Sequence, residues 1–280
     1  MISVIVPAYN AEATLPRTLD SLLAQTDRRW EAVIVNDGSF DATLEIAIDY
    51  AQRDKRFKIV HQENGGTASA LNAGVQASTE AFITHLDADD ELLPHFIERS
   101  LQAMVRFPDF DIYASNALYC TPGGKESLFN QGERFAQVTS LSLVDEIEAP
   151  QIFGTAAFRR TYFDQVGGFR PSIYNEDYDF WLRIIAAGAR HIYQPEPLAI
   201  YHASPDQKTS NVLRARRCDL VIMCDLAAVE GLSPAEYGTI KARITELKRN
   251  IRIRWVLYKL LGQQRAERMV RRQRDQAEGT

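Results

Sequence analysis

At 280 residues, the chain is long enough for one large domain, or one domain with an appendage, to bury a sizeable core. Its net charge of −5, with 45% hydrophobic and 25% charged residues, is typical of an ordinary soluble globule. Three scattered cysteines exclude a disulfide framework and a cysteine metal site, and no apolar run approaches the ~20 residues that span a bilayer. No secretory signal follows Met1, so a reducing, cytoplasmic compartment is expected.

The net charge hides an asymmetry between the two ends of the chain. Residues 212–280 hold 15 Lys and Arg against 8 Asp and Glu, a balance of +7, whereas the residues before them carry −12. A basic tail on an acidic body predicts a separate appendage that faces an anionic surface. The acidic body gives no reason to expect a nucleic-acid partner.

Strands alternate with helices through the first hundred residues. Helices of 10–15 residues between short apolar strands are typical of right-handed βαβ units and a mostly parallel sheet. The expected strands are 3–6, which Pro7 ends, then 30–35, 57–60 and 81–86, and the expected helices are 10–25, 42–52 and 67–77.

The last of these strands stops abruptly at three carboxylates, Asp87, Asp89 and Asp90. In an open α/β sheet, ligands collect beyond the carboxyl ends of the strands. Neighbouring carboxylates repel one another, and Mg²⁺ or Mn²⁺ removes that penalty because both prefer carboxylate oxygens. The alternative is a solvated acidic turn in which Asp87 or Asp90 caps the helix that begins near residue 92.

Known phosphate-binding loop motifs are missing from the chain. Neither a Walker-type GxxxxGK[ST] nor a GxGxxG after the first strand occurs, and residues 7–10 read Pro-Ala-Tyr-Asn. A dinucleotide-binding dehydrogenase is therefore not expected.

The following hundred residues are less regular. Residues 111–117 predict a strand, 122–124 a hairpin turn, and 131–151 show no clear period. A helix that begins at Glu176 would bury an apolar face. The free N–H groups at its amino end would favour ionised carboxylates at Glu176 and Asp177.

The basic tail predicts two helices. Ser233, Pro234 and Glu236 form a capping box with proline in the first turn, so the second helix should begin there. Arg and Lys alternate with Trp255, Tyr258 and isoleucines, as in interfacial amphipathic helices. A helical hairpin packed on the body or on a partner subunit is the alternative.

Five pieces of the chain, in order, resemble family-two glycosyltransferases, which are inverting enzymes of the GT-A fold that use a nucleotide sugar. The resemblance covers about residues 2–201. It implies an α/β, Rossmann-like, mostly parallel mixed sheet flanked by helices. The pieces are Val6–Asn10, Asn36–Ser39, Asn64–Gly66 with Leu71–Gly74, Leu86–Asp90, and Val166–Phe169 with Asn175–Arg183.

The resemblance also implies a domain plan and an activity. A catalytic domain would cover 1–210, with a nucleotide-sugar half at 1–105 and an acceptor half at 106–210, and a basic helical appendage would cover 211–280. The donor would be a nucleotide-diphosphate sugar, with a UDP-sugar expected, and Mn²⁺ or Mg²⁺ would be the cofactor. A saccharide or lipid-linked saccharide would be the acceptor, in surface-polysaccharide or glycan synthesis. The enzyme would act in the cytoplasm, with its tail on the inner face of the membrane, and a homo-oligomer is left open.

Site residues follow from the same resemblance. Asp177 would be the general base, Glu176 would position the acceptor, and Asp89 would bind the cation. His202 follows Tyr201 directly, which breaks the family's Tyr-Arg-x-His pattern, so a surface histidine remains the alternative to a metal ligand. Leu71 stands where many relatives have arginine. The nucleotide-sugar residues would be Pro7, Tyr9, Asn10, Asp37, Asn64, Gly65, Asn72, Asp87 and Ala88.

Plain structural roles compete with some of these assignments. Asp37 could accept a hydrogen bond from a nucleobase, or residues 37–39 could simply turn and cap the next helix. Gly65 could let backbone approach a ligand, or could only serve a turn. Two other classes stay open: a sugar nucleotidylyltransferase, which should have a Gly-rich, Arg-containing loop after the first strand, and a non-catalytic sugar-nucleotide-binding or scaffold protein.

Overall fold

The computed structural model describes residues 1–121, 123–124, 126–203 and 212–261. The described chain divides into two compact units, one within 1–207 and one within 208–280. Each unit is considered by itself.

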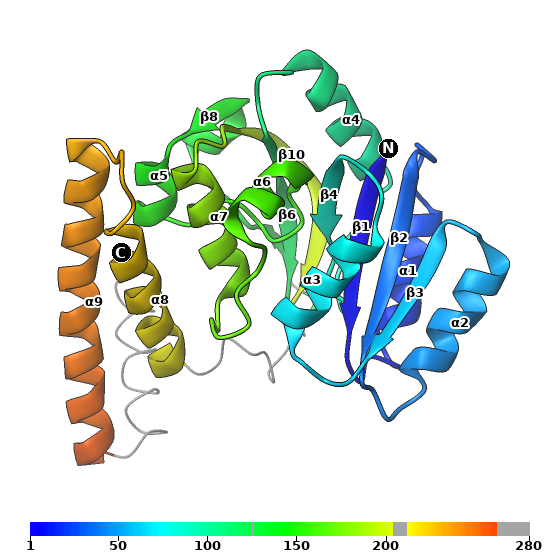
Figure 1. Cartoon of the computed structure of the whole chain (residues 1–280), viewed down its shortest axis with the longest axis horizontal. Coiled ribbons are helices and arrows are strands. Elements are labelled where there is room, and N and C mark those ends of the chain that lie inside the picture. Colours follow the sequence, from blue (N-terminus) through cyan, green and yellow to red (C-terminus); the bar gives the residue numbers. More distant parts are fainter. Residues whose placement is uncertain (122, 125, 204–211, 262–280) are drawn as a thin grey trace. The chain divides into compact units, whose positions relative to one another are not determined.

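The first unit is built around a ten-stranded mixed sheet with helices on both faces (Figure 1). Its strand order is β3-β2-β1-β4-β9-β6-β10-β5, with β7 beside β6 and β8 beside β10. The β1–β2, β2–β3, β1–β4 and β6–β10 pairs are parallel, whereas β9, which joins the two halves, is antiparallel to β4 and β6. The predicted α/β class, with a mostly parallel mixed sheet, is confirmed.

The expected alternation of strands and helices is present in the first half of this unit. Apolar β-branched runs form strands that are buried on both faces, as parallel sheets require. In chain order the elements are β1 (Ile2–Ala8), α1 (Leu15–Leu23), β2 (Trp30–Asp37), α2 (Thr43–Arg53), β3 (Phe57–Gln62), α3 (Thr67–Ala77), β4 (Phe82–His85), β5 (Glu91–Leu92) and α4 (Phe96–Arg106).

The second half of the unit adds strands from the far side of β9. It contains β6 (Ile112–Cys120), β7 (Glu126–Leu128), the 3₁₀ turn η1 (Glu133–Ala136), β8 (Thr139–Leu141), α5 (Leu143–Glu148), β9 (Ala157–Arg159), α6 (Arg160–Val166), α7 (Glu176–Ala186) and β10 (His191–His202).

Several predicted boundaries are wrong. Pro7 does not end β1, since it still pairs with Val35 of β2. On its other side it lies beyond the last β1–β4 pair, Ile5 with His85, so a proline is tolerated there. Helix α1 begins at Leu15 rather than at residue 10, after a turn. Residues 131–151 contain three short elements instead of none.

The core has two layers, one on each face of the sheet. Along β1, Ile2, Val4 and Val6 belong to the layer under α1, α2 and α4, whereas Ile5 belongs to the layer under α3, α6 and α7. Because side chains alternate along a strand, one apolar run supplies both layers. The sheet is therefore held rigidly, and its carboxyl edge can present polar groups at fixed positions.

The second unit is formed by α8 (Val212–Leu226) and α9 (Pro234–Leu261), which pack against each other. The predicted capping box of α9 is confirmed: Ser233 N donates to Glu236 Oε2 at 2.7 Å, and Glu236 N donates to Ser233 Oγ at 3.3 Å. Within the described ranges, no helix is long and apolar enough to cross a membrane.

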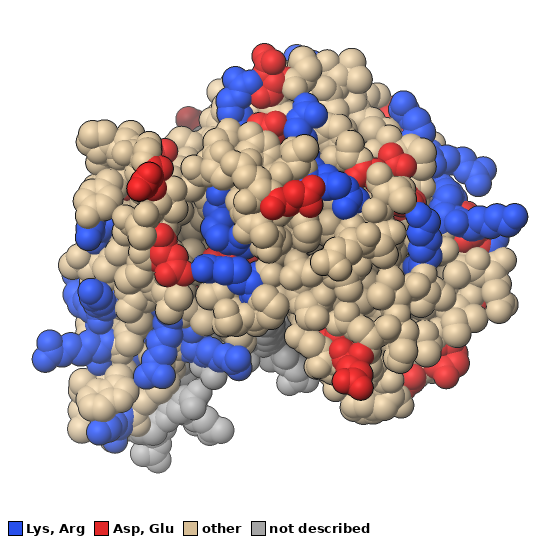
Figure 2. Space-filling model, viewed as in Figure 1, with Lys and Arg blue, Asp and Glu red and all other residues tan. Residues whose placement is uncertain are grey.

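The C-terminal half of α9 exposes large apolar side chains among basic ones. Ile253, Trp255, Val256 and Leu260 are exposed, and the Lys259 ammonium lies 4.1 Å from the Trp255 ring centroid. Figure 2 shows Lys and Arg side chains gathered along this helix. This half of α9 therefore exposes apolar and basic side chains together, and the membrane role of the helix stays a prediction.

Candidate active site

The three carboxylates after β4 form a compact cluster. Ligand oxygens of Asp87, Asp89 and Asp90 all lie within 4.8 Å of one another. Asp90 is only 2% exposed, and burial, with the charge of Asp87 adding to it, raises the pKa of Asp90 to about 9. The alternative of a solvated capping turn is wrong for Asp90, and the N-cap of α4 is His95.

Helix α1 fixes the backbone of this cluster. The hydroxyl of Thr18 donates to the carbonyl oxygen of Asp90 at 2.8 Å, and Arg17 Nη2 donates to that of Asp89 at 2.5 Å. The side-chain oxygens of a fixed acidic loop match what a hard divalent cation requires. The donor set therefore fits Mg²⁺ or Mn²⁺, and it includes Asp90, which was not assigned as a ligand from the sequence.

His202 lies beside the cluster without belonging to it. Its backbone N donates to Asp90 Oδ1 at 2.9 Å, which ties the end of β10 to the acidic loop. Its ring Nε2 lies 2.7 Å from Glu91 Oε1, the same oxygen that is 3.2 Å from Arg17 Nε. The imidazole is thus engaged with Glu91, and the group of close acidic ligands contains the three aspartates alone among the residues described.

Asp37 ends β2 and is almost completely buried. Its Oδ1 accepts from Gly65 N at 2.8 Å and from Gln62 Nε2 at 2.7 Å, and its Oδ2 accepts from Gly66 N at 2.8 Å. The amide of Asn64 donates to the Asp37 carbonyl at 3.0 Å. The structure therefore brings three predicted donor residues together, with the carboxylate holding the glycine loop, while each carboxylate oxygen can accept further bonds.

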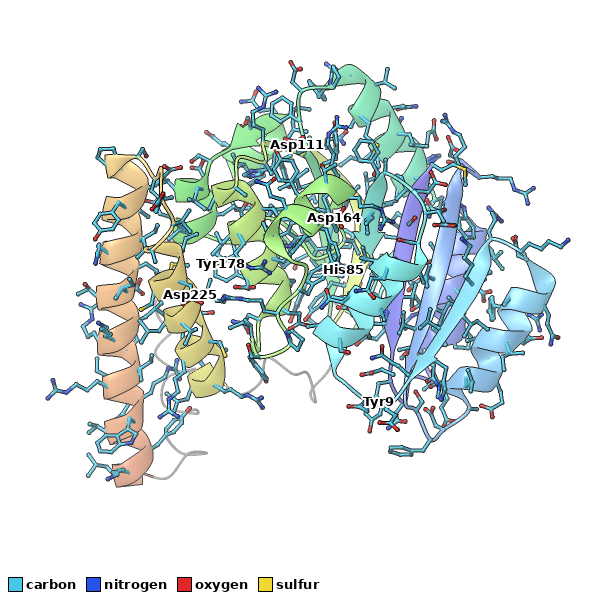
Figure 3. All side chains as sticks on the ribbon, in the orientation of Figure 1. Tyr9, His85, Asp111, Asp164, Tyr178 and Asp225 are labelled. Carbon is cyan, nitrogen blue, oxygen red and sulfur yellow. The ribbon has the colours of Figure 1, made fainter. Side chains whose placement is uncertain are left out.

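Tyr9 lies at the same edge, just after the end of β1 (Figure 3), and Asn10 follows it in the chain. Asn10 adopts a left-handed φ of 48°, which asparagine tolerates better than most residues, and its Oδ1 accepts from Phe40 N at 3.1 Å. The Tyr9 ring is 48% exposed, whereas Ala88 is buried within the acidic loop. Pro7 lies within β1, one residue before the end of the strand.

Asn72 has a structural contact that the sequence did not suggest. Its Nδ2 donates to the Phe169 carbonyl at 2.8 Å and its Oδ1 accepts from Phe169 N at 2.8 Å. A Cβ on Gly168, whose φ is +74°, would lie 2.6 Å from the same oxygen. Asn72 therefore ties α3 to the turn before α7, and the glycine is required for this close approach.

Asp177 and Glu176 occupy the first turn of α7, as predicted. Asp177 is half-buried and its Oδ1 accepts from Tyr178 N at 2.7 Å, whereas Glu176 is 8% exposed. Asp179, which is fully buried and also lies in the first turn of α7, accepts from Arg183 Nε at 2.8 Å. Arg183 also donates to the carbonyls of residues 166 and 168, so the start of α7 is braced against the preceding turn.

The sequence analysis missed His85, the last residue of β4. It is 5% exposed, stacks on Trp181 with ring centroids 6.4 Å apart, and meets the Phe169 ring edge-on at 6.0 Å. Burial lowers the pKa of His85, while the charges of Asp177 and Glu176 act in the opposite direction. The start of α7 therefore lies close to the end of β4, two residues before Asp87. The sequence signal was a histidine within an otherwise apolar strand.

Comparison with known proteins decides the family. Residues 3–167, more than half of the chain, match the family described as Glycosyl transferase family 2.

The chain belongs to glycosyltransferase family 2.

Relatives from bacteria agree with this membership. The chain is 43% identical over 99 residues to the uncharacterized glycosyltransferase EpsJ of Bacillus subtilis, which is 35% of this chain and 29% of EpsJ. It is 27% identical over 215 residues to the uncharacterized glycosyltransferase RT0329 of Rickettsia typhi, which is 75% of this chain and 66% of that protein. The chain thus spans about a third of the length of the first of these relatives.

Solved structures show the same fold. The S. aureus TarS fragment 1–349 in complex with UDP-GlcNAc has a TM-score of 0.74 at 19% identity, over 89% of this chain and 72% of that one. The mannosyltransferase PcManGT of Pyrobaculum calidifontis, in complex with GDP-Man and Mn²⁺, has a TM-score of 0.69 at 18% identity, over 99% and 80%. The predicted GT-A architecture of this family-2 chain is confirmed.

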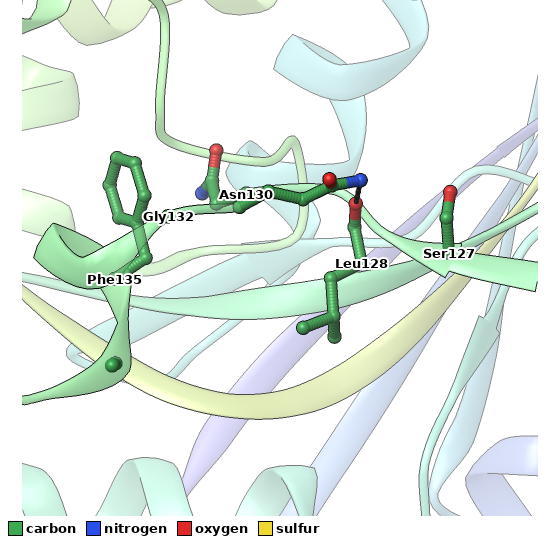
Figure 4. Close-up of a pocket in the computed structure, with 7 residues that line it drawn as sticks. Ser127, Leu128, Asn130, Gly132 and Phe135 are labelled. Atoms are coloured by element: carbon green, nitrogen blue, oxygen red, sulfur yellow. Dashed lines mark hydrogen bonds between the residues drawn. The ribbon is translucent and has the colours of Figure 1, made fainter.

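A cavity of about 480 Å³ lies within the half that the sequence assigned to the acceptor (Figure 4). Leu128 and Phe135 contribute apolar surface to it, and Asn130 and Gln131 contribute amides. Asn130 is fixed by Asn116, whose Nδ2 donates to its carbonyl at 2.9 Å. None of the lining residues belongs to the acidic cluster or to the predicted donor residues.

Proposed function

We propose that this chain transfers a sugar, with inversion, from a nucleotide-diphosphate sugar to a saccharide or lipid-linked saccharide acceptor. A UDP-sugar is the donor we expect. The observation that carries the proposal is the cluster of Asp87, Asp89 and Asp90 at the carboxyl end of β4, on the edge where Asp37 and Tyr9 also lie. Its chemistry suits a diphosphate held through a divalent cation.

Asp89 and Asp87 would hold Mn²⁺ or Mg²⁺, with the buried Asp90 completing the carboxylate set. When bound, the cation would stabilise the negative charge of the leaving diphosphate. Glu91 keeps the ring of His202 next to this site, so His202 remains our candidate for a further ligand. Asp37, with Asn64 and Gly65, would contact the nucleobase side of the donor.

Asp177 would act as the general base. Its half-buried carboxylate stands at the amino end of α7, and Trp181 of the same helix stacks on His85 at the end of β4. The acceptor hydroxyl oxygen would form a bond to the anomeric carbon as the bond from that carbon to the diphosphate oxygen breaks. The hydroxyl proton would pass to Asp177, and the nucleoside diphosphate would leave. One displacement inverts the anomeric centre and needs no covalent intermediate on the enzyme.

The acceptor half and the basic tail extend the proposal. The cavity beside Leu128 and Phe135 would take part of the acceptor. The exposed apolar residues of α9, with Lys259 and the neighbouring arginines, would place the enzyme on the anionic inner face of a membrane, where surface glycans are assembled.

The test compares two carboxylate variants. Nucleoside diphosphate release is measured from UDP- and GDP-sugars with Mn²⁺, in the presence of methyl glycosides and lipid-linked saccharides. A general base supplies about 10²–10⁴ in rate. Asp177→Asn should therefore bind the nucleotide with an affinity within a few-fold of wild type, but its turnover of the nucleotide sugar to nucleoside diphosphate should be at least about 100-fold slower. Glu176→Gln should lose less.

Two results would count against the proposal. If Asp177→Asn turns over at a rate near that of the wild type, or if Glu176→Gln is the inactive variant, the base is wrongly assigned. If the wild-type protein binds nucleotide sugars tightly but releases no diphosphate with any acceptor, a sugar-nucleotide-binding protein is the better description.

A further inference from the structure

Two exposed aromatic rings contact each other beyond the carboxyl ends of β1 and β2. Tyr9, which follows β1, is 48% exposed, and Phe40, in the loop after β2, is 82% exposed. Their ring centroids are 6.0 Å apart and their planes meet at 86°, an edge-to-face contact. Figure 3 places Tyr9 at the edge of the sheet. A single exposed phenylalanine is ordinary, but a pair in the crevice position of an α/β sheet is a surface suited to a ligand.

Hydrogen bonds hold the two loops that carry these rings. Asn10 N donates to Ser39 Oγ at 3.0 Å, and Phe40 N donates to Asn10 Oδ1 at 3.1 Å. One residue further along, Ala11 N donates to Thr43 Oγ1 at 2.8 Å, at the start of α2. The rings are therefore presented by loops that are already ordered, so a ligand that stacks on them pays little for ordering them.

The surroundings of the pair indicate which ligand it fits. Asp37, three residues before Phe40, offers a buried carboxylate, and the backbone N–H groups of Gly65 and Gly66 converge on it. A nucleobase combines flat π faces with N–H donors, so it can stack on an aromatic ring while it bonds to a carboxylate. A lipid chain would make no use of the carboxylate.

We propose that Phe40 is a positioning residue for the donor, which holds the Tyr9 ring as the stacking platform for the nucleobase. The inference rests on the proposed function, because it takes a nucleoside diphosphate as the ligand of this edge. The edge-to-face contact restricts the rotation of the Tyr9 ring, and the perpendicular Phe40 ring leaves a face of Tyr9 for the base. Since Phe40 is largely exposed, its replacement should leave the core unchanged.

The experiment titrates UDP and GDP, and separately inorganic pyrophosphate, into the full-length protein with Mn²⁺ by calorimetry. We expect Phe40→Ala to bind the preferred nucleotide about three- to tenfold more weakly, in keeping with the loss of one aromatic pair. Pyrophosphate affinity and the melting temperature should not change. Phe40→Tyr should restore nucleotide affinity and Phe40→Leu should not, because the ring matters more than its apolar area. Val105→Ala, at an equally exposed site on α4, is the control.

Each outcome separates this inference from the proposal on which it rests. Equal nucleotide affinity of Phe40→Ala and wild type would overturn the role of Phe40 and leave the proposed function intact. An equal loss for nucleotide and pyrophosphate would also overturn it, since the effect would then not concern the base. If wild type binds neither UDP nor GDP, the proposed function fails and this inference fails with it.

Discussion

Replacing the buried acid of the acidic cluster by its amide should stabilise the metal-free protein. Asp90 is 2% exposed and lies within 4.8 Å of Asp87 and Asp89. Asp90→Asn keeps nearly the same volume, and its amide oxygen can still accept the bond that His202 N donates at 2.9 Å. Because the pKa of Asp90 is raised to about 9 in the folded protein, the metal-free chain must take up a proton when it folds at pH 7.5. The substitution removes this cost while it preserves packing, and we expect the variant to unfold at a higher temperature in chelator.

The size of the effect follows from the pKa of Asp90, which is ordinarily about 3.9 and is raised to about 9 in the folded protein. One pKa unit corresponds to about 1.4 kcal/mol, so the proton taken up on folding at pH 7.5 costs at most about 5 kcal/mol. The buried asparagine amide has a desolvation cost of its own, so only part of this free energy is recovered. We expect a gain of about 1–3 kcal/mol, which corresponds to a rise of roughly 2–8 °C in Tm for a chain of this size.

The assay is thermal unfolding of wild type and Asp90→Asn at pH 7.5, in chelator and in excess Mn²⁺. Wild type should gain stability from the cation, by about 2.7 kcal/mol at a concentration 100 times the Kd, whereas the variant should gain much less. The advantage of the variant over wild type should thus shrink when Mn²⁺ is added. A variant that is less stable than wild type in chelator would refute the reasoning, because the buried acid would then carry no cost in the metal-free protein.

Two further predictions test the fold and the tail. Although burial opposes it, hydrogen bonds from Lys58, Ser3 and Thr79 lower the pKa of Glu31 to about 2. Glu31→Gln should therefore lower the free energy of unfolding by about 1–3 kcal/mol at pH 7, measured in urea. This loss should shrink as the pH falls from about 4.5 toward 2. Full-length protein should co-sediment with anionic vesicles at low salt and less at high salt, and Trp255→Glu should weaken this binding. Equal sedimentation of the two proteins would contradict the membrane role of α9.

The sequence predicts the parts of this fold that depend on local pattern. Alternating apolar runs and amphipathic helices specify the βαβ order, and the capping residues specify where α9 begins. The carboxylates after β4 and those at the start of α7 could be located because a strand end and a helix start have fixed geometry. Pro7 misled the prediction. A proline is tolerated at this position because β4 ends at His85, opposite Ile5, and the sequence does not show that β4 is this short.

Partners that are distant in sequence could not be predicted. Asn72 bonds to a residue 97 positions away, and the partner of His202, Glu91, is 111 positions away. Each polar side chain has many chemically equivalent partners, and the choice is made only when the sheet brings elements together. His85 was missed for the same reason, because nothing local shows that α7 packs over the end of β4.

The central claim is that the acidic edge of β4 binds a nucleoside diphosphate through a divalent cation. Calorimetric titration of UDP and GDP into wild type and Asp89→Asn, each in Mn²⁺ and in excess chelator, tests it most directly. We expect one of these nucleotides to bind wild type in Mn²⁺ and to lose at least about tenfold in affinity both in chelator and in Asp89→Asn, because each removes the link between carboxylate and diphosphate. Equal affinity with and without the cation, or an Asp89→Asn variant that binds nucleotide in Mn²⁺ as tightly as wild type, would contradict it.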